Sequence, residues 1–287
     1  MYTLPNNMKK SLEVRSRAKS IPLNVDAKMM RIRVIEVAER AGRAHIGPAL
    51  SVIDIVHVLY RDIMNRELLC LRDERRDRFI LSKGHGCLGL YVVLEKFGLL
   101  GNERLEDYCK YDSGLGGHPE SKTLDSVEFS TGSLGHGLPV AVGMAYALKL
   151  NQSDSKVIVL LGDGESAEGS NWEAALHASK HKLKNLWVII DFNNMQASGV
   201  LEDVLPLEPI EEKWQAFGFE TKSINGHSEV EIKDIFKTMT SDKPKCIIAN
   251  TIKGKGIPIA EDSSEWHHKA KISETEILAI KKSLESK

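Results

Sequence analysis

The residues of this chain best suited to chemistry are an aspartate and an asparagine that each stand just beyond an apolar run. Asp163 lies in Gly-Asp-Gly after the run at 156–161, and Asn193 follows the run at 185–191. A carboxylate and an amide supply hard oxygen ligands of the kind that Mg²⁺ prefers, and Mg²⁺ takes the rest of its roughly six ligands from phosphates and water. The pair therefore predicts a magnesium site, provided that the two runs end side by side.

Glycines on both sides of Asp163 give a reason to expect a phosphate at the same place. Gly162 and Gly164 let the backbone approach a phosphate closely and direct N–H groups toward it, and a helix expected from about Ser170 can add its positive end. A plain β-turn before an Asn-rich loop is the alternative, and it explains Gly-Asp-Gly alone. The spacing of strand, helix and second strand favours a Mg²⁺–diphosphate site.

The elements that must position this site alternate between strands and helices. Because the apolar runs are continuous rather than alternating, they predict an α/β fold, a parallel β-sheet with helices on both faces. Parallel strands end at the same edge of a sheet, which would bring Asp163 and Asn193 together. Strands are expected at 78–82, 156–161, 185–191, 219–224 and 245–251, and helices at 26–41, 51–63, 85–97, 137–150, 170–182, 229–240 and 273–285.

The ends of the elements suggest one domain preceded by an arm. Residues 1–25 are polar and are expected to form an irregular N-terminal arm, and 26–287 to form the domain. Ser51 is a candidate N-cap for the second helix, and Ser273 with Glu276 forms a capping box for the last one.

Bulk composition excludes several classes of protein. The chain of 287 residues is 42% hydrophobic and 28% charged with a net charge of −1, so no basic surface for nucleic acid is indicated. No apolar stretch approaches the roughly 20 residues needed to cross a bilayer, and the N-terminus lacks the apolar region of a signal peptide. A cytoplasmic location is expected. The four cysteines show neither CxxC nor zinc-ligand spacing.

Gly-Asp-Gly followed after residues 165–192 by an asparagine is similar to the thiamine diphosphate motif. The wider sequence resembles transketolase across most of the chain, in several segments that occur in the family's order. These segments are SKGHG (82–86), GGHPE (116–120), STGSLGHG (130–137), GDGESAEGSNWEA (162–174), TIKGKG (251–256) and EWHHK (265–269).

The resemblance implies a thiamine diphosphate-binding fold that holds thiamine diphosphate and Mg²⁺, with Ca²⁺ or Mn²⁺ as possible substitutes. Asp163 and Asn193 would ligate the metal through their side chains, and Met195 through its carbonyl. Further residues expected along the cofactor are Gly132, Leu134, Gly162, Gly164 and Glu165.

Four histidines would surround the reacting atoms. The resemblance places His85 and His267 at the diphosphate or reacting centre, and His45 and His118 in the substrate channel; histidine suits proton transfer to and from sugar hydroxyls near neutral pH. His268 competes with His267 for its role. The turn around His45 reads AHIGPAL and departs from the family's Gly-His-Pro-Gly, so the substrate edge is expected to differ.

A partner protein is also implied. The chain contains no segment resembling the family's pyrimidine-binding domain, so it is expected to be the N-terminal subunit of a split transketolase, inactive alone and assembled as an α2β2 heterotetramer with a C-terminal-half subunit. Glu168 would belong to a hydrogen-bond chain across the subunit contact. The expected substrates are small sugar phosphates, with transfer of a two-carbon ketol unit from a ketose to an aldose.

Other functions remain open. A second thiamine diphosphate enzyme, using pyruvate or another 2-oxo acid as donor, would share the motif, although EGSNWEA and GGHPE favour transketolase. A non-catalytic scaffold subunit is opposed by the intact Asp163, Asn193 and histidines. A dinucleotide-dependent dehydrogenase is disfavoured because no G-x-G-x-x-G opens a helix after a strand.

Overall fold

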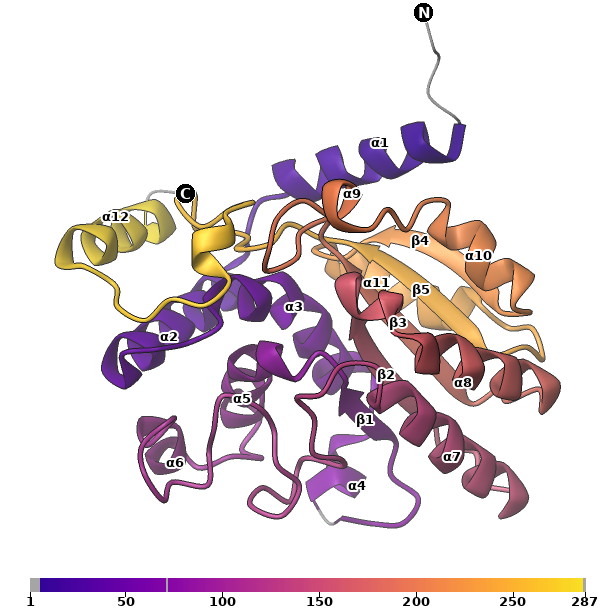
Figure 1. The fold of residues 1–287 in the computed structure, drawn as a ribbon. Helices are drawn as coiled ribbons and strands as arrows, with labels where there is room; N and C mark the ends of the chain where they lie inside the picture. The colour runs from indigo at the N-terminus through magenta and orange to yellow at the C-terminus, as the bar shows by residue number, and fades with distance from the viewer. Residues whose placement is uncertain (1–5, 71, 286–287) are drawn as a thin grey trace, which may run out of the picture.

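A five-stranded parallel sheet forms the centre of the protein in a computed structural model that describes residues 6–70 and 72–285. The strands lie in the order β1-β2-β3-β5-β4, with every neighbouring pair parallel (Figure 1). The predicted α/β fold is therefore confirmed. The strands are β1 (Arg78–Leu81), β2 (Val157–Gly162), β3 (Leu186–Phe192), β4 (Glu220–Asn225) and β5 (Lys245–Asn250).

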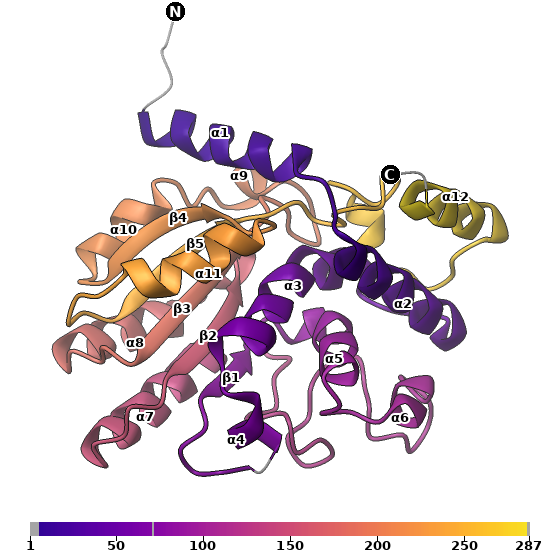
Figure 2. The ribbon, with the colours of Figure 1, turned by 180° about the vertical axis from the view of Figure 1, so that it is seen from behind.

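Both faces of the sheet are buried, which explains the unbroken apolar runs. Along β2, Ile158 and Leu160 enter one core while Val157 and Val159 enter the other. The first core is covered by α2 (Val25–Ala41), α3 (Ile46–Val58), α5 (Cys87–Lys96) and α11 (Glu229–Thr238), which Figure 2 shows on the near side of the sheet. The second core is covered by α7 (Gly137–Leu150), α8 (Gly169–Lys180) and α10 (Ile210–Ala216).

Helix α3 begins earlier than predicted, and Ser51 does not cap it. The helix starts at Ile46 with His45 at its N-cap position, because Pro48 in the first turn is compatible with a helix. Ser51 is instead fully buried within the helix, where its hydroxyl donates a hydrogen bond to Asp191 Oδ1 at 2.7 Å. The N-cap prediction for Ser51 was therefore wrong.

The N-terminal segment is not irregular where the structure describes it. Asn6–Ser20 forms helix α1, which packs against the ends of β4 and β5. Val14 and Ala18 lie one turn apart on the helix and are both buried, whereas the other side chains described on it, within residues 12–20, are half-buried or exposed. The prediction of an irregular arm was wrong for residues 6–20, and residues 1–5 lie outside the described part of the chain.

The remaining elements are short or peripheral. Helix α12 (Glu274–Glu285) packs on α2, and its predicted capping box forms, with Glu276 N–H donating to Ser273 Oγ at 3.3 Å and Ser273 N–H to Glu276 Oε2 at 2.8 Å. No helix among the described residues has the length and apolar character that crossing a bilayer requires. The short elements are α4 (Arg66–Cys70), α6 (Asn102–Glu106), α9 (Leu201–Val204), the π-turn Leu59–Ile63 and the 3₁₀ turns Gly84–Gly86, Gly164–Ala167 and Ser264–Trp266.

Candidate functional site

The loops that carry the predicted metal ligands are bonded directly to each other. Gly162 at the end of β2 is paired with Asp191 on β3. The next residue, Asp163, donates its N–H to the Asp191 carbonyl at 3.2 Å, and its Oδ2 accepts the N–H of Asn194 at 2.7 Å. The expectation that Asp163 and Asn193 arrive at the same edge of the sheet is therefore met.

Asp163 is a buried carboxylate whose hydrogen bonds come from the backbone. It accepts the N–H groups of Gly164 and Asn194, each at 2.7 Å, and only 3% of its surface is exposed. Burial, together with the nearby Asp191 charge, raises the pKa of Asp163 to about 6. A carboxylate in this environment is stabilised in its charged form by any cation that binds against it.

Asn193 is held in one orientation by the residue two places before it. Its Nδ2 donates to Asp191 Oδ2 at 2.9 Å and to Ser51 Oγ at 3.2 Å, while Oδ1 accepts the N–H of Met195 at 3.0 Å. Because an ionised carboxylate can only accept, Asp191 fixes which end of the Asn193 amide is oxygen. The amide oxygen is thus kept as a potential metal ligand.

Asp191 lies at the centre of a buried network that the sequence analysis did not identify. Its carboxylate forms an ion pair with Lys83 and accepts hydrogen bonds from Ser51 and Thr251. All four residues are at most 2% exposed. Burial alone would raise the pKa of Asp191, but Lys83 and the hydroxyl donors hold it below its ordinary value. Lys83 and Thr251 lie in the segments SKGHG and TIKGKG, so their presence was visible although their partners were not.

Lys253 brings a second buried ammonium group to the same loops. Its Nζ lies 2.8 Å from His267 Nδ1 and donates to the carbonyls of Met195 and Gln196 at 3.3 and 3.1 Å. Burial, followed by repulsion from Lys83, lowers the pKa of Lys253 to about 8. Two neighbouring cationic side chains suit a diphosphate, which carries the opposite charge.

The histidines expected around the reacting centre converge from four separate segments. The ring centroid of His45 lies 5.7 Å from those of His85, His118 and His267, and 4.8 Å from that of His268. His85 and His267 stack with their centroids 5.3 Å apart. A backbone bridge between residues 44 and 269 holds the two ends of this cluster together. His268 thus lies beside His267 in the same cluster.

The imidazoles of His45, His85, His118 and His267 are neutral near pH 7. Burial, assisted by the neighbouring His268, lowers the pKa of His45 to about 4, and burial with Lys253 lowers that of His267 to about 3. Burial also lowers the pKa of His85 and His118. A neutral imidazole offers one donor and one acceptor, which is what proton exchange with a hydroxyl requires.

The other predicted residues fall into two groups. Gly132 lies against His118, because a Cβ there would be 3.5 Å from the imidazole, and Leu134 follows it half-buried. Gly164 faces Gln196, whose side chain would lie 3.0 Å from a Cβ.

Glu165 and Glu168 are placed differently from those glycines. Glu165 Oε1 accepts from Gly135 N–H at 3.0 Å and from the Ser82 hydroxyl, and Oε2 accepts from Gly162 N–H at 3.1 Å. Glu168 is exposed at the N-cap of α8. The cofactor role of Glu165 and the intersubunit role of Glu168 stay predictions.

The donor set fits a magnesium-bound diphosphate. The described residues contain no cluster of three or more His, Cys, Asp or Glu side chains that could hold a metal, so a metal here would rely on mixed carboxylate, amide and backbone oxygens. Those are the ligands that Mg²⁺ takes together with phosphates. The Asp163 carboxylate, which has no ion-pair partner among the described residues, offers a partner to the cation, and the ammonium group of Lys253 offers one to the anion.

Known proteins with similar sequences point the same way. A family model described as transketolase, thiamine diphosphate binding domain, matches residues 24–287. One subunit of the apulose-4-phosphate transketolase of Actinobacillus succinogenes is 42% identical over 249 residues, which cover 86% of this chain and 90% of that protein. The 6-deoxy-6-sulfo-D-fructose transketolase subunit SqwG of a Clostridium species is 36% identical over 250 residues, which cover 86% and 91%.

Longer proteins match over a part of their length. Human transketolase is 38% identical over 244 residues, which cover 85% of this chain and 39% of the human protein. The crystal structure of transketolase from Campylobacter jejuni superposes with a TM-score of 0.82 at 33% identity, covering 91% of this chain and 43% of that one. The chain therefore spans less than half the length of these two transketolases and nearly all of the two subunits above.

Proposed function

The chain belongs to the family of transketolase thiamine diphosphate-binding domains, and from that premise we propose that it is the N-terminal subunit of a split transketolase. It would transfer a two-carbon ketol unit from a ketose phosphate to an aldose phosphate. The observation that carries the proposal is the convergence of Asp163 and Asn193, at the ends of adjacent strands, on one edge of the sheet. Four histidines gather in one cluster, and Lys253 links one of them, His267, to the loop after β3.

The proposed partner is a second subunit that carries the rest of the enzyme. Two relatives of about this chain's length are named as subunits of transketolases, whereas human transketolase is matched over 39% of its length. Glu168, which is exposed at the start of α8, is where we propose that the partner makes contact. We expect an α2β2 assembly that is active only when both subunits are present.

In this proposal Asp163, Asn193 and the Met195 carbonyl hold Mg²⁺, and the ion together with Lys253 holds the diphosphate, while Lys83 stays paired with Asp191. When bound, the thiazolium of thiamine diphosphate supplies the electron sink that breaking a C–C bond beside a carbonyl requires. The protein's part is to orient the sugar, to exclude water and to move protons.

The histidine cluster is suited to that proton transfer. His45 and His118, neutral near pH 7, can accept a proton from a sugar hydroxyl and return it at the same nitrogen. His85 and His267, stacked on each other, lie on the side of Lys253. We propose that the first pair faces the sugar and the second pair faces the diphosphate.

The sugar itself is proposed only by class. The two relatives named as subunits differ in the substrates for which they are named, a sugar phosphate in one and a sulfo-sugar in the other. We propose a phosphorylated sugar, the class for which the first of these relatives is named, and the half-buried histidines suit its polar hydroxyl groups. The altered turn at His45, which begins α3, is where the acceptor preference is expected to differ.

A donor assay on the reconstituted complex tests this function. The chain is co-expressed with its proposed pyrimidine-binding partner subunit, and ketol transfer is measured with a ketose phosphate and with pyruvate as donors. We expect Mg²⁺- and thiamine diphosphate-dependent transfer from the ketose phosphate. If the complex decarboxylates pyruvate but does not transfer a ketol unit, the chain is a subunit of a 2-oxo acid enzyme and not of a transketolase. If the two subunits assemble but show no turnover with either donor, the chain is a non-catalytic scaffold subunit.

A variant of the same complex tests the substrate-channel assignment. His118→Ala is expected to leave cofactor binding intact and to lower turnover by about 10²-fold or more, as for loss of a general acid or base. Unchanged turnover would remove His118 from the channel.

A further inference from the structure

Helix α1 lies on the candidate cofactor site although it precedes the matched domain in sequence. Both Figure 1 and Figure 2 show it crossing above β4 and β5, beside the loops that follow the strands. Its buried side is small and consists of Val14 and Ala18 among the residues with described side chains. Lys255 also donates to the Lys19 carbonyl at 2.7 Å. The helix is thus docked mainly by polar contacts.

Arg15 makes the contact that matters for the site. Its Nη1 donates to the carbonyl of Asn193 at 2.7 Å and to the carbonyl of Thr251 at 3.0 Å, while Nη2 bonds to Asp262 Oδ1 at 2.6 Å. Asn193 directly follows β3 and Thr251 directly follows β5. One planar guanidinium therefore ties together the ends of two adjacent strands.

The side chains of these same two residues, Asn193 and Thr251, take part in the predicted magnesium site. The Asn193 amide is the predicted Mg²⁺ ligand, and the Thr251 hydroxyl donates to Asp191, which in turn fixes that amide. Holding the carbonyl of Asn193 restrains the peptide plane between residues 193 and 194. The N–H in that same peptide plane belongs to Asn194 and donates to Asp163 Oδ2 at 2.7 Å. Arg15 thus acts on one peptide that both predicted metal ligands share.

We propose that Arg15 is a positioning residue of the magnesium–diphosphate loop, and that helix α1 is consequently part of the cofactor site. Arg15 orients the peptide between Asn193 and Asn194, so that the Asn193 amide and the Asp163 carboxylate are in place before the metal arrives. The inference rests on the proposed function, since it concerns the cofactor of that function. It concerns the protein's own residues, and it needs no contact between Arg15 and the cofactor.

Arg17 provides a matched control on the same helix. Its Nη1 pairs with Glu231 Oε1 at 2.8 Å on α11, and its side chain is 58% exposed. Arg17→Ala removes an ion pair of similar length that holds α1 to α11 but does not contact the loop after β3. If Arg15 only held α1 in place, Arg15→Ala would therefore have the same effect as Arg17→Ala. Arg15→Lys is a second variant, because lysine keeps the charge beside Asp262 but cannot donate in the same planar geometry to two carbonyls.

The experiment titrates thiamine diphosphate at saturating Mg²⁺, and Mg²⁺ at saturating thiamine diphosphate, into the reconstituted two-subunit complex by calorimetry. Arg15→Ala is expected to weaken both affinities by about 10- to 100-fold, as for loss of an outer partner of a metal ligand. Arg15→Lys is expected to lie between Arg15→Ala and wild type, and Arg17→Ala to match wild type. Hydrogen exchange without cofactor gives an independent measurement, in which the Asn194 amide is expected to exchange faster in Arg15→Ala than in Arg17→Ala.

The outcomes separate this inference from the function beneath it. If the wild-type complex binds thiamine diphosphate and Arg15→Ala binds it equally well, with unchanged exchange at Asn194, the positioning role is wrong and the function stands. If Arg17→Ala weakens binding as much as Arg15→Ala, the effect belongs to docking of α1 and the proposal also fails. If the wild-type complex binds no thiamine diphosphate, the proposed function itself is overturned and this inference with it.

Discussion

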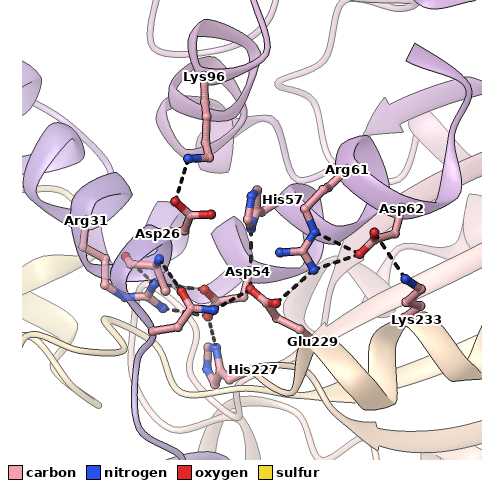
Figure 3. A network of polar contacts seen from close by, with 12 residues as sticks. Asp26, Arg31, Asp54, His57, Arg61, Asp62, Lys96, His227, Glu229 and Lys233 are labelled. Atoms are coloured by element: carbon pink, nitrogen blue, oxygen red, sulfur yellow. Dashed lines mark hydrogen bonds and ion pairs between the residues drawn. The ribbon is translucent and has the colours of Figure 1, made fainter. Parts of the chain in front are cut away.

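Two buried carboxylates, Asp54 and Asp163, have opposite surroundings within the same domain. Asp54 lies on α3 and receives both arms of Arg31, with Nη1–Oδ1 at 2.9 Å and Nη2–Oδ2 at 2.7 Å, and His227 Nδ1 at 2.7 Å (Figure 3). Although burial alone would raise its pKa, Arg31 and His227 hold the pKa of Asp54 well below its ordinary value. We call Arg31, Asp54 and His227 the Asp54 cluster.

Asp163 has no such protein partner. Its hydrogen bonds come from two backbone amides, and its pKa is raised to about 6 by burial and by Asp191. No Lys or Arg among the described residues forms an ion pair with it. Asp54 is therefore neutralised by the fold itself, whereas Asp163 is suited to a cation that comes from outside. The contrast separates a carboxylate that stabilises the protein from one that binds a ligand.

The Asp54 cluster also supports the site mechanically. His227 Nε2 accepts the N–H of Ile252 at 2.9 Å, and Arg31 Nε donates to the Lys255 carbonyl at 2.7 Å. Both of these backbone groups lie in the loop after β5 that carries Lys253. The accepted bond at Nε2 places the imidazole proton on Nδ1, where it is donated to Asp54, so His227 is neutral. The Asp54 cluster thus fixes the backbone of a loop that belongs to the candidate site.

The largest expected effect is on stability, from Asp54→Ala. The substitution leaves Arg31 buried and unpaired, and removing one partner of a buried ion pair typically costs about 3–5 kcal/mol. The free energy of unfolding is measured by denaturant titration. Asp26→Ala is the control, because its ion pair with Lys96 at 2.9 Å is 45% exposed at the carboxylate and such pairs contribute about 0–1 kcal/mol. A loss below about 1 kcal/mol for Asp54→Ala would contradict the assignment of this cluster to stability.

Asp163→Asn is expected to affect binding more than stability. The substitution removes a buried charge, but asparagine has one acceptor oxygen for the two backbone N–H groups that Asp163 accepts, and leaving one of them unsatisfied costs about 1–3 kcal/mol. Because the gain and the loss offset each other, the metal-free chain should lose less unfolding free energy than Asp54→Ala does. In the two-subunit complex, the affinity for thiamine diphosphate in the presence of Mg²⁺ should fall by about 100-fold, or about 2.7 kcal/mol. Calorimetry measures the second effect and denaturant titration the first. Unchanged affinity, or a loss of stability similar to that of Asp54→Ala, would remove the contrast between the two carboxylates.

The sequence was sufficient to locate the loops that carry Asp163 and Asn193, but not the buried polar networks around them. Continuous apolar runs predicted the parallel sheet, and that topology alone places residues after β2 and β3 together, which is why Asp163 and Asn193 were found. Polar partners distant in sequence leave no local pattern. Lys83 pairs with Asp191, which lies 108 positions away in the sequence. Ser51 was predicted to be an N-cap from its local sequence alone, because its actual partner, Asp191, lies 140 positions away.

Helix α1 and the Asp54 cluster were missed for a related reason. Arg31 and Asp54 lie on helices where charged residues usually face solvent, and only tertiary packing shows that both are buried. The α1 segment is polar with few apolar positions, so its periodicity was too weak to predict a helix, and Arg15 gains its role from loops far along the chain. A site formed by residues at the ends of adjacent strands can be predicted from the sequence. A site that depends on which distant side chains pair with each other cannot.

A smaller loss of stability is expected from His227→Leu. Leucine leaves the Ile252 N–H without its acceptor and removes one donor from Asp54, and leaving a buried polar group unsatisfied costs about 1–3 kcal/mol. Because Arg31 still neutralises Asp54, the loss should be less than that of Asp54→Ala. Denaturant titration of both variants side by side gives the order. Equal losses would mean that the cluster fails as a unit, and a loss under about 0.5 kcal/mol would mean that His227 is not needed to hold the loop after β5.

The smallest expected effect, and the only stabilising one in this region, comes from His57→Leu. His57 is 1% exposed and stacks on Phe97, but neither ring nitrogen has a hydrogen-bond partner among the described residues, and its Nδ1 lies 3.7 Å from Glu229 Oε1, too far for a hydrogen bond. Leucine of similar size removes two unsatisfied polar atoms, so a gain of about 1 kcal/mol in unfolding free energy is expected at pH 7.5.

The pH dependence of His57→Leu provides the sharper measurement. Burial, followed by repulsion from Arg61, lowers the pKa of His57, so the folded protein keeps this ring neutral while the unfolded chain takes up a proton near pH 6.5. Keeping the ring neutral therefore carries no proton-linked penalty above about pH 6.5, and the penalty grows as the pH falls toward the folded pKa, by at most about 1.4 kcal/mol per pH unit. Wild type should lose more stability than His57→Leu between pH 7.5 and 5.5, as measured by denaturant titration at both pH values. If wild type instead loses less stability than His57→Leu as the pH falls, His57 is protonated in the fold and pairs with Glu229; equal responses would mean that folding does not lower the pKa of His57.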